Sequence, residues 1–331
     1  MKTTKLFLML TAAIMGLLVS SCSEDDDDMS VIHSVYINDN GETSNGTDFE
    51  AIDSVSFYLD HIKYRIITDK YLSVYGYDKS KFTGTEKIVS VITYRGKTYT
   101  TYSISNDAFN ECKKLTELII PDSVRSVLRG AFNGCSELVS IKVSPTNPYL
   151  DSRNNCNAVI ETKKNELMLG CKTTVIPYGV TSIGTGAFMW CEGIVSLDIP
   201  SSVTSIGDWA YAHCNGLITI DIPNSIQTIG SNAFSGCQNV TTITIGENVE
   251  TIGNKAFDTY SIPESIHCKA TTPPMCYSGN SPYIWDVVFN LEAYDRSTLY
   301  VPKGTKDAYK KSLTFYNAFP EWGRFQKIVE E

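Results

Sequence analysis

The 331-residue sequence has no excess of basic residues and no sign of a membrane-spanning helix. Its 28 lysines and arginines stand against 37 aspartates and glutamates, which gives a formal net charge of −9. Because phosphate groups attract positively charged surfaces, this balance argues against nucleic acid as a partner. The apolar run from Leu6 to Val19 has 14 residues, whereas a transmembrane helix needs about 20. The 42% hydrophobic content is nevertheless sufficient for a folded core.

Motifs of common enzyme sites are also missing. The sequence contains no G-x-S-x-G, no pair of catalytic carboxylates and no dinucleotide fingerprint. The stretch "RGKT" at 95–98 lacks the upstream glycine of a phosphate loop, and we expect it to form a hairpin turn. None of the four histidines has a cysteine or carboxylate at metal-ligand spacing: His33, His61, His213 and His267. The sequence therefore predicts no catalytic residue, no metal site and no cofactor.

The first residues have the pattern of an export signal. Lys2 and Lys5 precede the apolar run, and small residues lead to Cys22, which predicts a signal peptide over residues 1–21. The stretch "LVSSC" at 18–22 resembles the lipobox of bacterial lipoproteins, which implies acylation of Cys22. Three acyl chains would exceed the two signals that stable membrane anchoring requires. An ordinary signal peptide with an incidental cysteine is the alternative.

An acidic segment, "SEDDDD" at 23–28, follows Cys22. Like charges repel, so residues 22–30 are expected to form an extended tether. The segment resembles the acidic export signal that follows the lipid-bearing cysteine in surface lipoproteins. This resemblance implies attachment to the outer membrane with the chain facing the cell exterior, and a plain solvated linker is the alternative.

One short unit recurs along the chain. Ala-aromatic pairs begin at 108, 131, 187, 210, 233 and 256, and all intervals are 23 residues except one of 56. The units share A-F-x-x-C-x-x-L-x-x-I-x-I-P-x-S-V-x-x-I-G. The two isoleucines before the proline lie two apart, so both point to the same side of a strand, which the proline then ends. Stacked units would bury the repeated Ala, Phe, Cys and Leu side chains.

This unit resembles the BspA-like subclass of leucine-rich repeats, directly over residues 106–268. The resemblance implies a mainly β repeat solenoid with a parallel sheet on its concave face and a cap at each end. We expect a small antiparallel sheet over 55–104, and at the other end a strand to Pro302, a helix from about Thr305 and an apolar hook. The predicted organisation is a signal peptide over 1–21, an acylated cysteine with tether over 22–30, a β-rich N-terminal cap over 31–105, the solenoid over 106–268 and a strand–helix C-terminal cap over 269–331.

Two places depart from the regular pattern. Leu128 and Arg129 precede Gly130 where other units read Ile-Gly, so the turn there should differ. The 56-residue interval contains a 33-residue insertion near 147–177. Alternating apolar residues around "TKKN" predict a hairpin with strands Ala158–Glu161 and Glu166–Gly170.

Ten cysteines in an exported chain first suggest disulfides, but five occupy the same slot of the repeat: Cys112, Cys135, Cys191, Cys214 and Cys237. We expect that slot to face inward and to hold free thiols that act as small hydrophobic groups. For the same reason, His213 beside Cys214 is not expected to be a base–nucleophile pair. Cys156 and Cys171 flank the inserted hairpin and are the one pair for which we consider a disulfide.

The remaining place for function is the exposed face of the strands. The position between the two core residues of each strand should point outward: Ile119, Lys142, Asp198, Asp221 and Thr244. The preceding outward position is held by Glu117, Ser140, Ser196, Thr219 and Thr242; four of these five carry hydroxyls, which can bond along the ladder. The first set is chemically varied, so it is the predicted partner contact, with Thr242 as a further candidate.

These features indicate a non-enzymatic surface lipoprotein. The family resemblance implies adhesion through the solenoid to a host extracellular-matrix protein, another bacterial surface protein or a glycan. The alternative is an envelope scaffold or an accessory component of a nutrient-uptake assembly. A hydrolase with residues hidden in the insertion has no motif in its favour, and the ligand itself does not follow from the fold.

Overall fold

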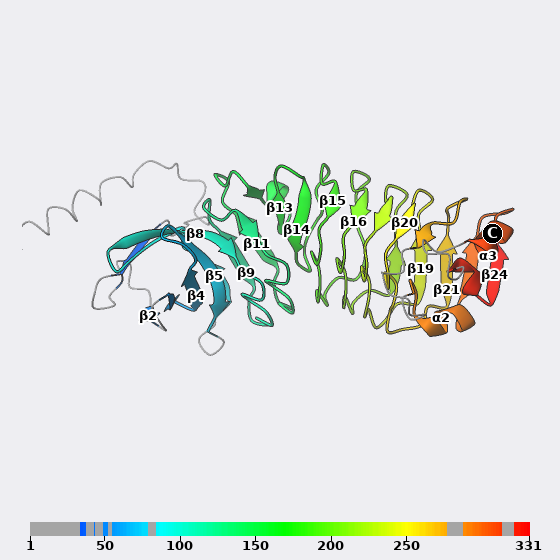
Figure 1. Cartoon of the computed structure of the whole chain (residues 1–331), viewed down its shortest axis with the longest axis horizontal. Coiled ribbons are helices and arrows are strands. Elements are labelled where there is room, and N and C mark those ends of the chain that lie inside the picture. The colour runs from blue at the N-terminus through cyan, green and yellow to red at the C-terminus, as the bar shows by residue number, and fades with distance from the viewer. Residues whose placement is uncertain are drawn as a thin grey trace, which may run out of the picture. The chain divides into compact units, whose positions relative to one another are not determined.

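The computed structural model describes residues 34–37, 43, 49–51, 55–78, 84–276, 287–312 and 321–331. The predicted signal peptide, the lipidation site at Cys22 and the acidic tether lie outside these residues. Within them, short strands dominate and successive repeats stack their strands in parallel, so the predicted β solenoid is confirmed (Figure 1).

The N-terminal region forms one sheet with the order β1-β7-β8-β5-β4-β3-β2. Its strands are β1 (Ser34–Ile37), β2 (Phe49–Ala51), β3 (Ser56–Leu59), β4 (Ile62–Ile66), β5 (Tyr71–Tyr77), β7 (Val91–Tyr94) and β8 (Lys97–Ile104). Hairpin turns join β4 to β5 at residues 67–70 and β7 to β8 at Arg95 and Gly96, where a turn was expected within "RGKT". The sheet is mixed rather than antiparallel, because β8 returns beside β5 in the same direction and β1 also pairs in parallel with β7.

Glu86, in β6 (Thr85–Lys87), is a buried carboxylate in this region. Burial raises its pKa from 4.5 to about 7, although His61, whose Nδ1 lies 3.3 Å from Oε1, acts to lower it; Asp60 adds a smaller upward effect. A carboxyl group whose pKa is raised by folding stabilises the fold at low pH, and that contribution is lost as pH rises through the folded-state pKa.

The free energy of unfolding is therefore expected to fall between about pH 4.5 and 7 because of Glu86. Glu86→Gln should remove this component. The free energy of unfolding of the variant, relative to that of the wild type, should therefore rise by about 2–3 kcal/mol between pH 4.5 and 8. Urea unfolding of both proteins across this range measures the difference. Parallel pH curves would contradict the assignment.

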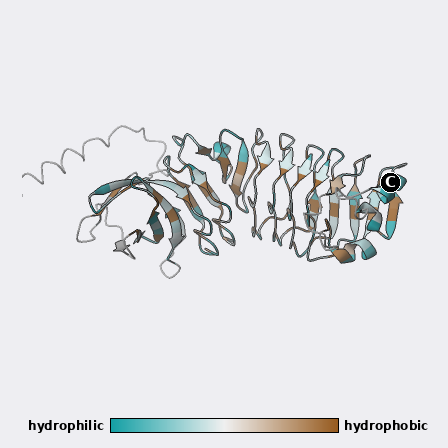
Figure 2. Cartoon of the chain, viewed as in Figure 1, coloured by the Kyte–Doolittle hydropathy of each residue, from teal (hydrophilic) through white to brown (hydrophobic). Residues whose placement is uncertain are grey.

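Each regular repeat contributes two short strands. On the predicted concave face lie β9 (Glu117–Ile120), β11 (Ser140–Val143), β17 (Thr219–Asp221), β19 (Thr242–Ile245) and β21 (Ser265–Cys268). On the returning arm lie β10 (Ser126–Val127), β15 (Ser182–Ile183), β16 (Ser205–Ile206), β18 (Thr228–Ile229), β20 (Thr251–Ile252) and β22 (Met275–Cys276). Hydrophobic and hydrophilic residues alternate within most of these strands, as in β11 and β19 (Figure 2).

The concave-face sheet is split, which corrects the expectation of one continuous sheet. One part has the order β11-β9-β6, and the other begins at β17, whereas residues 194–200 between them form no strand. The insertion explains the break. Thr173 donates a hydrogen bond to the carbonyl of Val139, and the Cβ of Lys172 would lie 2.7 Å from a β-carbon on Gly193. This segment thus occupies the place where 194–200 would pair with β11.

The insertion contains the predicted hairpin, with β13 (Ala158–Glu161) antiparallel to β14 (Glu166–Gly170). Strand β12 (Leu150–Asp151) and the short helix η1 (Arg153–Asn155) precede it. Strand β14 pairs in parallel with β15, so the returning-arm ladder starts from the hairpin and runs to β22. The returning-arm ladder therefore contains more strands than either part of the concave-face sheet.

Strand β13 also divides the hydrophobic core in two. Val159 packs in the N-terminal cluster, and its neighbours Ala158 and Ile160 pack in the C-terminal cluster. Cys156 belongs to the C-terminal cluster and Cys171 to the N-terminal one. Both are free thiols in the structure, so the disulfide considered for this pair is not formed there.

Rings and thiols stack through the solenoid interior. Phe188, Tyr211, Phe234 and Phe257 form successive near-parallel pairs with centroids 4.9, 5.4 and 5.5 Å apart. Three of the repeat thiols donate to the carbonyl of the aromatic residue in the preceding repeat: Cys135 to Phe109 at 3.2 Å, Cys214 to Phe188 at 3.1 Å and Cys237 to Tyr211 at 3.4 Å. Burial raises the pKa of Cys214 well above its ordinary value, so the repeat cysteine is a packing group.

The C-terminal region continues the ladder of β17, β19 and β21 in register. Its elements are α2 (Leu291–Arg296), β23 (Thr298–Val301), α3 (Lys306–Lys311), η2 (Trp322–Arg324) and β24 (Lys327–Glu330). The hook residues Trp322, Phe325 and Ile328 are buried, and the Trp322 indole donates to the carbonyl of Pro274 at 2.9 Å. Among the described helices, none has the length and apolar character needed to cross a membrane.

Candidate binding surface

A row of side chains follows the face of the sheet that begins at β17. Asp221, Thr244, His267 and Tyr300 are paired in register on β17, β19, β21 and β23. Asp198 occupies the equivalent repeat position one unit earlier. We call these five residues the outer row. Neighbouring strands lie about 4.8 Å apart, so a partner spanning the row would meet two carboxylates and then a hydroxyl, an imidazole and a phenol in turn.

The predicted contact residues differ in their environments. Asp198 and Asp221 are exposed, whereas Thr244 and Thr242 are half-buried. Asp198 lies outside any strand, where its Oδ2 accepts a hydrogen bond from the Ser196 hydroxyl at 3.4 Å. Thus both predicted carboxylates are available to a partner, and Asp198 lies at the break in the sheet.

Ile119 and Lys142 do not behave as expected. Ile119 is only 1% exposed, so the prediction that it contacts a partner is wrong. It lies on the central strand of a three-stranded sheet, flanked in register by Lys87 and Lys142. The Nζ of Lys142 lies 3.0 Å from Oε1 of Glu117, so this lysine is held in an ion pair. The varied surface therefore belongs to the later repeats.

His267 and Tyr300 were missed by the sequence prediction. Their rings stack with centroids 4.5 Å apart, and Nδ1 of His267 lies 2.9 Å from a carboxylate oxygen of Glu331. His267 follows Thr244 by 23 residues, so strict application of the repeat period could have found it. Tyr300 comes from the C-terminal region at a different interval, and no repeat signal marks it.

The neighbouring row is mostly a ladder of hydroxyls. Thr219, Thr242, Ser265 and Thr298 are in register, and Ser265 donates to Thr242 at 3.4 Å. In the earlier sheet, Ser140 donates to Glu117 at 3.0 Å. These contacts agree with the interpretation that this row bonds along the ladder, which leaves the outer row as the better candidate for recognition.

His213 and Cys214 point apart, as the repeat position indicated. The His213 ring stacks on Trp190 with centroids 3.8 Å apart, whereas the Cys214 thiol is buried against the Phe188 carbonyl. In the part of the chain that the structure describes, no group of three or more histidine, cysteine or acidic residues is arranged to hold a metal ion.

A family model decides the identity of the repeats. Six copies of the BspA type leucine rich repeat region match residues 50–162 and 166–274. The chain belongs to this family. The match begins at residue 50, so BspA-type repeats extend into the region that we predicted as an N-terminal cap. The gap in the match, residues 163–165, falls at the turn between β13 and β14 of the inserted hairpin.

Solved structures of bacterial leucine-rich repeat proteins are similar to this BspA-type chain. A leucine-rich cell surface protein from Faecalibacterium prausnitzii shares 22% identity over 76% of this chain and 56% of its own, with a TM-score of 0.38. A leucine-rich repeat protein from Bacteroides ovatus shares 24% identity over 65% of this chain and 49% of its own, with a TM-score of 0.38. This chain thus spans about half of each. No curated protein matches it.

Proposed function

We propose that this BspA-type protein is a non-enzymatic binding module of the cell surface that recognises its partner through the outer row. The observation that carries the proposal is the row itself: carboxylate, hydroxyl, imidazole and phenol groups succeed one another at in-register positions, while the core positions between them stay aliphatic. Repeat solenoids commonly bind through such extended faces. The similar protein from Faecalibacterium prausnitzii is described as a cell surface protein, which supports the location.

The partner that fits is a macromolecule: a host extracellular-matrix protein, another bacterial surface protein or a glycan. The outer row offers hydrogen-bond donors and acceptors and one stacked aromatic pair along successive strands, an extended contact that suits a macromolecule. The anchor in this proposal is lipid on Cys22 in the outer membrane, with the acidic tether directing the solenoid to the exterior.

Charge reversal in the outer row tests the binding surface. Asp198→Lys combined with Asp221→Lys is expected to weaken partner binding at least tenfold, because both carboxylates are exposed and replaced by the opposite charge. The measurement is binding of the purified full-length chain to an array of matrix proteins, bacterial surface proteins and glycans.

The matched control is Glu192→Lys combined with Glu250→Lys. Both residues are exposed, lie outside the outer row and make the same change in net charge. This control should bind as the wild type does, and both variants should keep their unfolding free energy within about 0.5 kcal/mol for each exposed site. Equal loss of binding in both variants would assign the effect to net charge and contradict the proposal.

A scaffold or an accessory component of nutrient uptake is the second candidate function. Protease treatment of intact cells separates a displayed protein from one that faces the periplasm. Cleavage of the solenoid is expected here, and full protection until the cells are lysed would overturn the surface location.

A further inference from the structure

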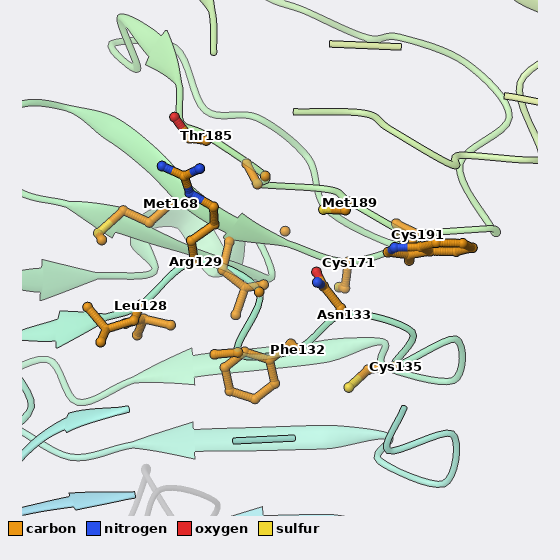
Figure 3. Close-up of a pocket in the computed structure, with 18 of the residues that line it drawn as sticks. Leu128, Arg129, Phe132, Asn133, Cys135, Met168, Cys171, Thr185, Met189 and Cys191 are labelled. Carbon is orange, nitrogen blue, oxygen red and sulfur yellow. The ribbon is translucent and has the colours of Figure 1, made fainter. Parts of the chain in front are cut away.

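A groove crosses the turns that lead from the concave-face strands to the returning arm in the last three units. It is lined by Asn224, Ser225 and Gln227 of one turn, residues 247–250 of the next and residues 271–275 of the last. We call it the turn groove. Its volume is about 500 Å³, within the range of roughly 300–1,000 Å³ that is typical of ligand sites. Two other hollows are smaller: a cavity of about 30 Å³ lined by Phe132 and Cys191 (Figure 3) and one of about 110 Å³ lined by Gly193 and Ile194.

The turn groove follows from the length of the last turn. Ile245 and Thr251 pair with Cys268 and Met275 of the next unit, so an interval of six residues faces one of seven. The regular turn contains "GENVE" and the longer one contains "KATTPP". Because both ends of the longer turn stay in register, its middle leaves the stack of turns and a space opens beside it.

Hydrogen bonds between neighbouring units hold the polar part of the lining in place. The Asn224 side chain donates to Oε1 of Glu247 at 2.9 Å and accepts from the Glu247 amide at 3.1 Å. The Asn248 side chain donates to the carbonyl of Asn224 at 2.8 Å. The amide of Glu250 donates to the carbonyl of Gln227 at 2.8 Å, so these two residues lie beside each other on adjacent turns. A lining fixed in this way is preorganised for a ligand.

Several polar side chains of the turn groove have no partner among the described residues. Gln227, Glu250, Thr271 and Thr272 are exposed, and their side chains make no hydrogen bond or ion pair there. The bond from Asn224 also uses only one of the two carboxylate oxygens of Glu247. Oxygen acceptors therefore outnumber N–H and O–H donors among the groups that are open to a ligand.

The charge of the lining is negative. Its described residues include the carboxylates of Glu247 and Glu250 but no lysine, arginine or histidine. An anionic ligand, such as a phosphate, a sulfated glycan or the C-terminus of a chain, would be repelled. A cationic ligand is favoured, and the formal net charge of −9 on the whole chain acts in the same direction.

Part of the lining is apolar. It is formed by Pro273, Pro274 and Met275, and Met275 is 44% exposed. The amide of Met275 donates to the carbonyl of Glu250 at 2.7 Å, so the apolar part begins next to an unpaired carboxylate. A positive charge on an apolar stem, as in arginine or lysine, fits both parts of the lining. A neutral sugar fits less well, because it would leave the two carboxylates without a countercharge and no aromatic ring among the described lining residues could stack on it.

We propose that the turn groove binds an arginine side chain presented by a polypeptide. Arginine carries several N–H donors in a planar fork and no acceptor, which complements a lining rich in oxygen acceptors. The guanidinium pairs with Glu250 and donates to the oxygens of Gln227 and the two threonines, while the aliphatic stem packs on Met275. The remaining volume holds the residues on either side of the arginine. No residue of the outer row lines this site, so the inference goes beyond the proposed function.

The test uses the purified full-length chain and three probes: acetyl-Ala-Arg-Ala-amide, the same peptide with lysine, and the same peptide with citrulline, which has the shape of arginine without its charge. Binding is followed by NMR through the side-chain amide signals of Gln227. The arginine peptide is expected to shift these signals and to bind at least tenfold more tightly than the citrulline peptide, with the lysine peptide between them. Binding should weaken as the salt concentration rises.

Glu250→Gln should reduce binding of the arginine peptide at least tenfold, because the variant keeps the shape of the side chain and loses its charge. The melting temperature should stay that of the wild type, since Glu250 is exposed and makes no ion pair among the described residues. The matched control is Glu192→Gln, an equal charge change at an exposed residue outside the turn groove, and it should leave binding unchanged.

Several outcomes would overturn the proposal. Equal binding of the arginine and citrulline peptides would remove the role of the charge, and equal loss in Glu250→Gln and Glu192→Gln would ascribe binding to the net charge of the chain. Tighter binding of a neutral oligosaccharide, maltotriose, than of the arginine peptide would assign the turn groove to a sugar instead. The outer-row variant with Asp198→Lys and Asp221→Lys should still bind the arginine peptide, so failure of the outer row and failure of the turn groove are distinguishable.

Discussion

Replacing Phe234 with alanine is expected to lower the free energy of unfolding by about 3–5 kcal/mol. The Phe234 ring is fully buried, and it stacks between Tyr211 and Phe257 at centroid distances of 5.4 and 5.5 Å. Its removal leaves a cavity between two repeats, and a solenoid depends on contacts between neighbouring repeats. Urea unfolding followed by circular dichroism measures the change.

Tyr260→Ala is the control for this prediction. Tyr260 is 64% exposed and has only an edge contact with His213, whose ring centroid is 5.8 Å away. Its removal should cost less than about 1 kcal/mol. If both variants lost the same stability, the stacked rings would not be the main support between repeats.

Replacing Gly230 with alanine is expected to cost about 3 kcal/mol or more, at the upper end of what overpacking does. A β-carbon there would lie 2.4 Å from the backbone nitrogen of Asp208 and 2.5 Å from the carbonyl carbon of Gly207. Both are backbone atoms of the preceding repeat, so no side chain can rotate away to relieve the contact. The glycine of each regular unit thus sets how closely the returning arms approach. Thermal or urea unfolding of the variant checks this.

Gly76→Ala is the matched control. A β-carbon on Gly76 would make only ordinary contacts, at 3.7 Å from Lys63, and should change stability by no more than about 1 kcal/mol. Comparable destabilisation by both alanines would contradict the close-approach explanation. Leu128 occupies the equivalent slot in the first repeat, where the segment before it is β8; its amide donates to the carbonyl of Ile104 at 2.9 Å, as the amide of Gly230 does to Ile206.

The repeat period predicted most of the fold. A 23-residue spacing with apolar positions two apart requires a strand in each unit, and stacking is the only arrangement that covers both its edges and its apolar side chains. The hairpin followed from an alternating pattern around a turn, and its strands β13 and β14 have the predicted ends. The inward position of the cysteines followed from their fixed distance to the aromatic residue.

The site was less predictable, because it depends on contacts between segments far apart in the sequence. Ile119 has the alternation of an outward residue, but its burial depends on the flanking strands β6 and β11. The break in the sheet depends on the contacts that residues 171–176 of the insertion make with Val139 and Gly193. Tyr300 joins the outer row only because β23 continues the ladder in register. The amides of Phe132 and Gly134, which have no acceptor among the described residues, have no sequence signal beyond the irregular turn at Leu128 and Arg129.

Hydrogen exchange of the full-length chain, with and without the first partner captured on the array, tests the central claim most directly. The partner is expected to slow exchange of amides along β17, β19, β21 and β23, which carry the outer row, and to leave the returning-arm ladder from β15 to β22 unchanged. Protection confined to the N-terminal sheet or to the inserted hairpin would contradict the assignment of the outer row as the binding surface.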